Sequence, residues 1–148
     1  MSVRQMPQMT GRKMKNWMIA TCIGVMALVG WSGSLSAQTA LKDVERIREG
    51  IIATGIAYEI SEQCSSISPR YLRGIGFLNS LKSHARDLGY SEAQIESYID
   101  DSKEKKRLEA IARERLEALG AVAGSQTSYC AVGRAQIEAG SDIGRLLR

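Results

Sequence analysis

The sequence is poor in the residues on which most catalytic and metal-binding sites depend. It has one histidine, one phenylalanine, two tryptophans and three cysteines among 148 residues. A structural zinc site usually needs about four Cys or His ligands. No Cys-x-x-Cys motif is present for redox chemistry or haem attachment, and no Gly-x-Ser-x-Gly motif follows residue 37. The sequence therefore predicts neither a metal nor a cofactor.

The first 37 residues have the pattern of a secretory signal peptide. An apolar run, Trp17–Gly30, is followed by the small, polar segment Ser32–Ala37. The run is preceded by four basic residues and no acidic one, namely Arg4, Arg12, Lys13 and Lys15. This order is typical of export signals. We expect cleavage after Ala37, or one residue earlier after Ser36, and Met14 is an alternative start of the chain.

Two membrane-attached alternatives bear on the same segment. An uncleaved anchor stays open because residues 16–41 carry no charge. A membrane span, however, needs about 20 predominantly apolar residues, and polar residues dilute the run after Trp31. We reject a lipoprotein site at Cys22 because this cysteine lies early in the apolar run.

Removal of the leader changes the charge balance of the chain. The whole sequence has 20 Lys and Arg against 16 Asp and Glu. Four of the cations lie in the leader, so residues 38–148 carry 16 of each sign and no net charge. The run Lys103–Arg107 contains Glu104 and no aromatic residue, which is typical of a solvated helix face. The sequence therefore does not predict a nucleic-acid-binding domain.

Cys64 and Cys130 remain as an even pair after the leader is removed. Export delivers a chain to an oxidising compartment, where two thiols are usually joined. We therefore predict a disulfide between them. Closing a loop of this length stabilises a fold by about 4 kcal/mol on the chain-entropy model.

Hydrophobic periodicity predicts helices throughout residues 38–148. The first helix is expected at about 43–63, and its segment 51–60 is apolar on nearly every side, which predicts enclosure by other helices. For the second helix, Ser68 is the expected N-cap and Pro69 the first residue, and Gly89 ends it. The apolar side of this second helix is expected to comprise Tyr71, Gly74, Ile75, Phe77, Leu78, Leu81, Ala85 and Leu88.

Three further helices and a last turn complete the prediction. Ser91 and Gln94 form a capping box for a short third helix. A fourth helix is expected at about 103–119 with an exposed Glu109–Arg113 pair, a fifth at about 128–139, and a last turn at 143–147. The side chains that the fourth helix is expected to turn inward are Leu108, Ile111, Ala112, Leu116 and Leu119.

These elements predict an all-α protein. Residues 38–148 are expected to form a single domain, a small compact bundle of about five helices with one disulfide. Five glycines fall inside the predicted helices, and we expect them to mark close approaches between helices. They are Gly50, Gly55, Gly74, Gly76 and Gly133.

Four polar residues are the candidates for a site. Glu59 is the only charge within residues 51–60, and a buried carboxylate needs a partner, which Arg73 or Arg134 can supply. A structural ion pair is favoured over a catalytic role for it. His84, expected to be half exposed, is the obvious general-base candidate. We therefore take Glu59, Arg73, Arg134 and His84 as a functional or ion-pair cluster and assign no catalytic residue.

Several short segments resemble a known family. They are Gly55–Ile60, Leu72–Gly74, Leu88–Ser91, Ser128–Cys130 and Gly133–Arg134, with the ending Ile143–Arg148. Over about residues 43–148 the chain resembles the small secreted alphaproteobacterial proteins catalogued as domain of unknown function 5333. The resemblance implies a Gram-negative periplasm and supports the Cys64–Cys130 bridge. It carries over no catalytic residue.

Two functions of different classes follow as hypotheses. The first is a non-enzymatic interaction protein of the periplasm, namely an inhibitor, an assembly partner or a chaperone-like helper whose partner is another periplasmic protein. The second is a small periplasmic hydrolase or lyase that uses Glu59 and His84. The first is favoured because the sequence lacks a nucleophile and base at recognisable spacing.

Overall fold

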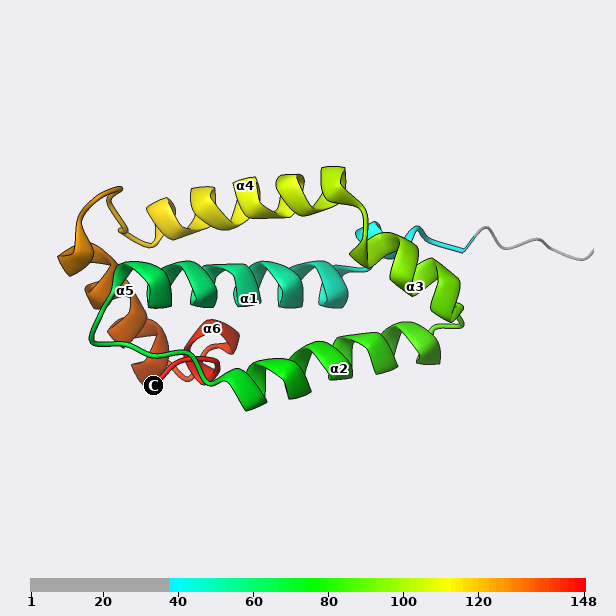
Figure 1. Cartoon of the computed structure of the whole chain (residues 1–148), viewed down its shortest axis with the longest axis horizontal. Helices are drawn as coiled ribbons and strands as arrows, with labels where there is room; N and C mark the ends of the chain where they lie inside the picture. The colour runs from blue at the N-terminus through cyan, green and yellow to red at the C-terminus, as the bar shows by residue number, and fades with distance from the viewer. Residues whose placement is uncertain (1–37) are drawn as a thin grey trace, which may run out of the picture. The chain divides into compact units, whose positions relative to one another are not determined.

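The helix α1 (Glu45–Gln63) lies between α2 (Tyr71–Asp87) and α4 (Ser102–Ala118) in the computed structural model, which describes residues 38–148 (Figure 1). The other elements are the 3-10 turn η1 (Leu41–Asp43), α3 (Glu92–Ile99), α5 (Gln126–Glu138) and α6 (Asp142–Arg145). No strand occurs in this range, which confirms the predicted all-α class. The predicted leader and its cleavage site lie outside the described residues.

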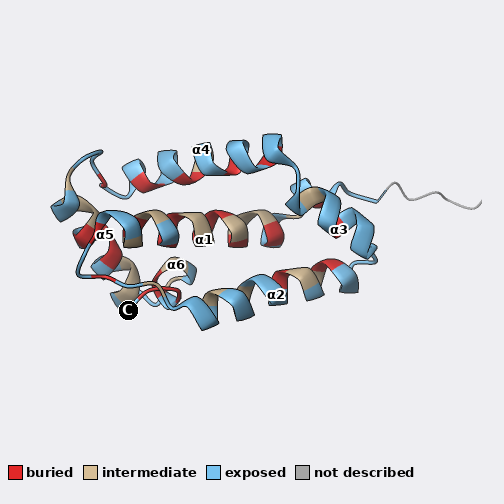
Figure 2. Cartoon of the chain, viewed as in Figure 1, coloured by how far each residue is buried: buried red, intermediate tan, exposed pale blue. Residues whose placement is uncertain are grey.

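The central position of α1 follows from its composition. Its apolar residues point in nearly every direction, so the helix is stable only where other elements cover it. Seven of its residues are buried, and Ile52 and Ile60 are 1% and 0% exposed. Burying side chains of this size contributes about 1.5–3 kcal/mol each. The predicted enclosure of residues 51–60 is thus confirmed in part, since five of these ten residues are buried and Tyr58 is exposed, and α1 carries both buried and less buried stretches in Figure 2.

The main core joins α1 to α4, α5 and the C-terminal segment. Leu116 of α4, Cys130 of α5 and Leu147 near the chain end are all buried against α1 residues. A second cluster lies at the beginning of α1, where η1, α2 and α3 meet it. Its buried members are Leu41, Ile47, Ala85, Tyr90 and Ile95. Each of the helices α1 to α5 contributes residues to at least one of the two clusters.

The predicted start of α2 is wrong, because the backbone around Ser68 pairs with the chain end. The Ser68 N–H donates to the Arg148 carbonyl at 2.8 Å, and the Arg148 N–H donates back at 2.9 Å. Arg70 likewise donates to Leu146, so Pro69 lies opposite Leu147 in an isolated antiparallel bridge. A proline, which has no N–H, fits between two donors of such a ladder. The helix therefore begins at Tyr71, with no side-chain cap.

The predicted inner side of α2 is only partly buried. Leu81 and Ala85 are buried as expected. Tyr71, Ile75 and Leu78, however, are 71%, 57% and 39% exposed, and the first turns of α2 carry the colour of exposed residues in Figure 2. Leu146 and Leu147, in contrast, are buried in the main core with residues of α1. Leu88 is also exposed.

The remaining helices differ from the prediction mainly at their ends. Asp43 belongs to η1 and not to α1. The helix α4 ends at Ala118. The helix α5 begins two residues earlier than predicted, at Gln126, after the N-cap Ser125. The expected inward side chain Leu119 is 43% exposed. The capping box of α3 at Ser91 is confirmed. The Glu109–Arg113 pair of α4 is also confirmed, at 3.7 Å.

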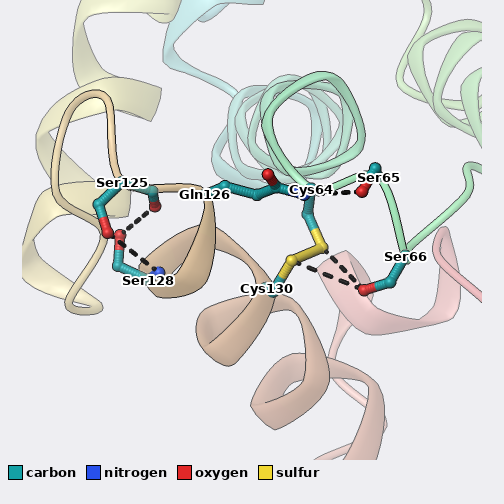
Figure 3. Close-up of a disulfide and its surroundings, with 7 residues drawn as sticks. All are labelled: Cys64, Ser65, Ser66, Ser125, Gln126, Ser128 and Cys130. Carbon is teal, nitrogen blue, oxygen red and sulfur yellow. Dashed lines mark hydrogen bonds between the residues drawn. A yellow bond between two sulfur atoms is a disulfide. The ribbon is translucent and has the colours of Figure 1, made fainter.

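The disulfide joins the end of α1 to the middle of α5 (Figure 3). The Cα atoms of Cys64 and Cys130 are 5.1 Å apart. The hydroxyl of Ser66 lies 3.3 Å from the Cys64 sulfur. Gln126, in the first turn of α5, donates to the Ser65 hydroxyl at 2.6 Å. The predicted disulfide is therefore present, and it fixes α5 across the end of the central helix.

The glycine prediction is confirmed at two positions and wrong at two others. A Cβ on Gly50 would lie 2.7 Å from Leu81, where α1 meets α2, and one on Gly133 would lie 2.8 Å from Ile60. Gly74 and Gly76 have no atom within 4 Å of such a Cβ. No helix approaches them because the first half of α2 is exposed. No helix of the described residues is long and apolar enough to cross a bilayer.

Alanine at Gly133 should lower the free energy of unfolding by about 1–3 kcal/mol, because the added methyl must displace the buried Ile60 and Ile67. The matched change Gly76→Ala, in open space inside α2, should instead raise it by about 0.5–1 kcal/mol. Denaturant unfolding of both variants measures the difference. Equal effects at the two positions would contradict the close approach of α5 to α1.

Candidate functional site

An apolar groove of about 790 Å³ runs along the side of α1 that no other helix of residues 38–148 covers. Residues of α2 and α4 form its two walls, and α3 with Leu41 closes one end. The α1 residues that line it are Ile47, Ile51, Thr54, Gly55, Tyr58 and Glu59. Their spacing of three or four residues places them on one side of the helix. The groove is thus the fourth side of a helix that is apolar nearly all round.

The walls of the groove combine buried and exposed apolar side chains. Leu81 and Ala85 of α2 and Leu108 and Ala112 of α4 are buried at its base. Higher up, Leu78, Tyr58 and Ile99 are 39%, 59% and 49% exposed. Ile75 and Tyr71 of α2 are also exposed, about one and two turns before Leu78, but they do not line the groove. We call these five exposed residues the apolar rim. Contiguous exposed apolar surface of this kind often marks an interaction site.

An ion pair between the buried Glu104 and the exposed Arg107 lies where α3 closes the groove. Glu104, in the first turn of α4, is 8% exposed and accepts two hydrogen bonds from the Arg107 guanidinium, at 2.8 and 2.6 Å. Hydrogen bonding by Arg107 lowers the pKa of Glu104 below its ordinary value of 4.5. The carboxylate therefore stays charged at neutral pH, and its charge is balanced by its neighbour.

The hydroxyl of Tyr98 lies at the same end of the groove. Its oxygen is buried and has no hydrogen-bond partner in the described part of the chain. Burial, followed by the negative charge of Glu104, raises the pKa of Tyr98 to about 12. The hydroxyl is therefore protonated at neutral pH and can act as a hydrogen-bond donor, but it cannot act as a base.

Three charged residues that line the groove take part in no ion pair of the described residues. They are Lys82 of α2, Lys105 of α4 and Glu59 of α1. Lys82 lies in the field of Glu92 and contributes to lowering the pKa of that carboxyl, of which Arg86 is the main cause. The other three charged residues that line the groove, Glu104, Glu109 and Arg113, each belong to an ion pair of α4.

The four residues that the sequence singled out are not joined to one another. Glu59 is half-buried, lines the groove and accepts a hydrogen bond from Gln63 at 3.4 Å. His84 is half-buried on α2, as expected, but it does not line the groove. Arg73 and Arg134 are exposed. No ion pair within residues 38–148 links Glu59 to either arginine.

Tyr98 and Glu104 were not predicted from the sequence as polar members of the site. A signal for Glu104 was available, since it lies four residues before Leu108 and so continues the buried stripe of α4. No comparable signal existed for the groove itself, because exposed and buried apolar residues look alike in a sequence. Residues 38–148 also contain no group of three or more His, Cys, Asp or Glu that could hold a metal ion.

Acid should weaken the fold through Glu104. Because its folded-state pKa lies below 4.5, its contribution to stability is complete above about that pH and is lost as the pH falls through the folded value. The change Glu104→Gln should lower the free energy of unfolding at pH 7 by about 1–2 kcal/mol, since hydrogen bonds to charged groups are worth about 1.5–3 kcal/mol and Arg107 stays partly solvated. Urea unfolding at pH 7 and at pH 3 measures both values.

The matched control is Glu109→Gln, which breaks only the exposed pair with Arg113 and should change stability little at either pH. At pH 3 the difference in the free energy of unfolding between wild type and Glu104→Gln should be smaller than at pH 7. An equal difference at pH 3 and pH 7 would contradict the claim that acid weakens the fold through Glu104.

The chain matches a protein-family model described as a family of unknown function (DUF5333), over residues 39–148. No curated protein and no solved structure matches it. The matched range includes every helix of the described chain and all residues that line the groove.

Proposed function

The chain belongs to DUF5333, a family of unknown function, and we propose that it is a non-enzymatic interaction protein of the periplasm. In this proposal the groove between α2 and α4 binds an apolar segment of another periplasmic protein. The partner is an enzyme that the protein inhibits, a complex that it helps to assemble, or an unfolded client that it protects.

The groove is the observation that carries the proposal. It is apolar, about 790 Å³ in volume, and lined by three of the five exposed side chains of the apolar rim, namely Leu78, Tyr58 and Ile99. An apolar side of a central helix that the fold leaves uncovered is stabilised when a second molecule covers it. A groove of this kind between helices is a common receptor for apolar faces of other proteins.

The periplasmic location rests on the leader and the disulfide. The pattern of residues 1–37 is that of an exported chain, and a disulfide between two buried cysteines is compatible with an oxidising compartment. The resemblance to secreted alphaproteobacterial proteins supports a Gram-negative host.

The alternative is a small hydrolase or lyase that uses Glu59 and His84. One observation favours it, namely that Glu59 and Tyr58 both line the groove. Against it, His84 does not line the groove, and the Tyr98 hydroxyl is held protonated. Loss of a detected activity in both Glu59→Gln and His84→Ala would support this alternative, and indifference to both changes would exclude it.

The substitution Leu78→Lys should abolish partner binding, because it places a charge on the apolar wall of the groove. The full-length chain is expressed in a Gram-negative host, precipitated from the periplasm with a specific antibody at pH 7 and pH 4, and its partners are identified by mass spectrometry. The matched control is Leu88→Lys, at the C-cap directly after the same helix and similarly exposed but outside the groove.

We expect wild type and Leu88→Lys to retain the same partners and Leu78→Lys to lose them. One stoichiometric partner identifies an inhibitor or assembly factor, and many acid-dependent clients identify a chaperone-like helper. Partners that bind all three forms equally, or no partner at either pH, would contradict binding through the groove.

A further inference from the structure

We propose that the exposed first half of α2 binds the surface of an anionic lipid bilayer. The inference goes beyond the proposed function, because it concerns a surface beside the groove and a different partner. The residues that carry it share exposure and a position at the beginning of α2, and none of them lines the groove. We call them the α2 patch, and they are Arg70, Tyr71, Leu72, Arg73 and Ile75.

The apolar side chains of the α2 patch protrude from the fold. No residue from 71 to 80 is buried, and Tyr71, Leu72 and Ile75 are 71%, 87% and 57% exposed. Figure 2 shows the first turns of α2 in the colour of exposed residues. Because the transfer of apolar surface out of water is favourable, these three side chains are stabilised when an apolar phase covers them.

Basic residues accompany these side chains, and acidic residues are absent. Residues 63–86 contain no Asp or Glu and carry four cations, Arg70, Arg73, Lys82 and Arg86. Since residues 38–148 carry 16 charges of each sign, the remainder of this range has 12 cations against 16 acidic residues. Positive charge is thus concentrated on one helix of a domain without net charge. This pattern is typical of basic amphipathic helices that lie on membrane surfaces.

The cations in the second half of α2 have acidic residues close by. Arg86 forms an ion pair with Glu92, and Asp87 follows it directly in the sequence. Lys82 lines the groove together with Glu59 of α1. We therefore leave the second half of α2 out of the proposed surface.

Arg70 and Arg73 have no such neutralising neighbour. Both are exposed, and neither takes part in an ion pair within residues 38–148. Arg148, whose backbone pairs with Ser68, carries the terminal carboxylate as well as a cationic side chain and so adds little net charge. The α2 patch therefore combines three protruding apolar side chains with two unpaired cations.

A lipid surface matches both properties of the α2 patch. In a bilayer the phosphate groups lie directly above the acyl chains, so arginines can pair with phosphates while neighbouring apolar side chains enter the layer below. Tyrosine is enriched at this boundary. A purely acidic macromolecule would pair with Arg70 and Arg73 but leave Leu72 in water. A second copy of the same patch would bring like charges together.

Vesicle binding tests the inference. The full-length sequence is expressed in a Gram-negative host, and the protein is purified in the form that the host produces. Co-sedimentation at pH 7 and low salt measures its affinity for vesicles of phosphatidylcholine alone and for vesicles with about one third phosphatidylglycerol. Wild type should bind the anionic vesicles about 10- to 30-fold more tightly, because each cation near such a surface contributes about a factor of 5. High salt should remove this preference.

Two pairs of substitutions separate the contributions of charge and apolar surface. Arg70→Gln with Arg73→Gln should lower the affinity for anionic vesicles about 10- to 30-fold and leave the binding to neutral vesicles unchanged. Leu72→Gln with Ile75→Gln should lower the affinity for both kinds of vesicle, by about 10-fold or more. Because none of the four side chains is buried, all variants should fold, which circular dichroism checks.

The matched controls make the same kinds of change elsewhere on the surface. Lys103→Gln with Lys106→Gln removes two exposed cations of α4 that belong to no ion pair of the described residues. Leu119→Gln with Val122→Gln removes two exposed apolar side chains that follow α4. Both controls should bind vesicles like wild type. Any contribution of residues 1–37 is the same in every form and cancels in the comparison.

Equal affinity of wild type for neutral and anionic vesicles would overturn the inference. Substitutions in the α2 patch that bind like wild type, or controls that lose as much affinity as they do, would also overturn it. Binding to polyglutamate without binding to vesicles would assign the two arginines to an acidic macromolecule instead. Retention of partners by Leu78→Lys would contradict the proposed function alone, because Leu78 is unchanged in all of these variants.

Discussion

The burial of α1 is the constraint on which the rest of the structure depends. A helix that is apolar on nearly every side loses stability wherever it meets water, so the chain must bring other elements to it from several directions. α4 covers one side, α5 and the C-terminal residues cover a second, and α2 covers a third through the contact of Leu81 with Gly50. Ile52 and Ile60 are accordingly almost completely enclosed.

Residues 38–148 contain no further helix for the fourth side. α5 is held across the end of α1 by the Cys64–Cys130 bridge, and the chain end is held by the backbone pairing of Ser68 with Arg148. These two connections fix Leu146 and Leu147 against the core and leave the first half of α2 without a buried residue. The groove and the apolar rim are therefore consequences of where the chain ends are fixed. The proposed binding of another molecule rests on this arrangement.

The sequence predicted the helices well because their signals are local. Periodicity located the five longer helices, and the capping box at Ser91 and the stop at Gly89 follow from backbone chemistry within a few residues. The start of α2 was predicted wrongly, because a local Ser-Pro signal was overridden by pairing with residues about 80 positions away in the chain. The prediction that Gly74 and Gly76 mark close approaches between helices was wrong for a similar reason. No local sequence pattern shows whether a second helix lies opposite a glycine.

The candidate site was less predictable than the fold. Glu59 was singled out as an unusual charge among apolar residues, and it lines the groove. Its expected arginine partners, however, depend on how separate helices rotate against each other, which no single-sequence pattern encodes. Leu78 and Leu81 illustrate the limit: both lie on the apolar side of one helix, yet one is 39% and the other 5% exposed.

The central claim, that one side of α1 and its neighbouring walls stay open, is tested most directly by solvent paramagnetic relaxation of methyl groups in the intact protein. A soluble paramagnetic agent should strongly broaden the methyl signals of Leu78 and Ile99 and leave those of Ile52 and Ile60 sharp. Equal protection of all four residues would contradict the account, because the groove would then be filled by another part of the chain or by a second copy.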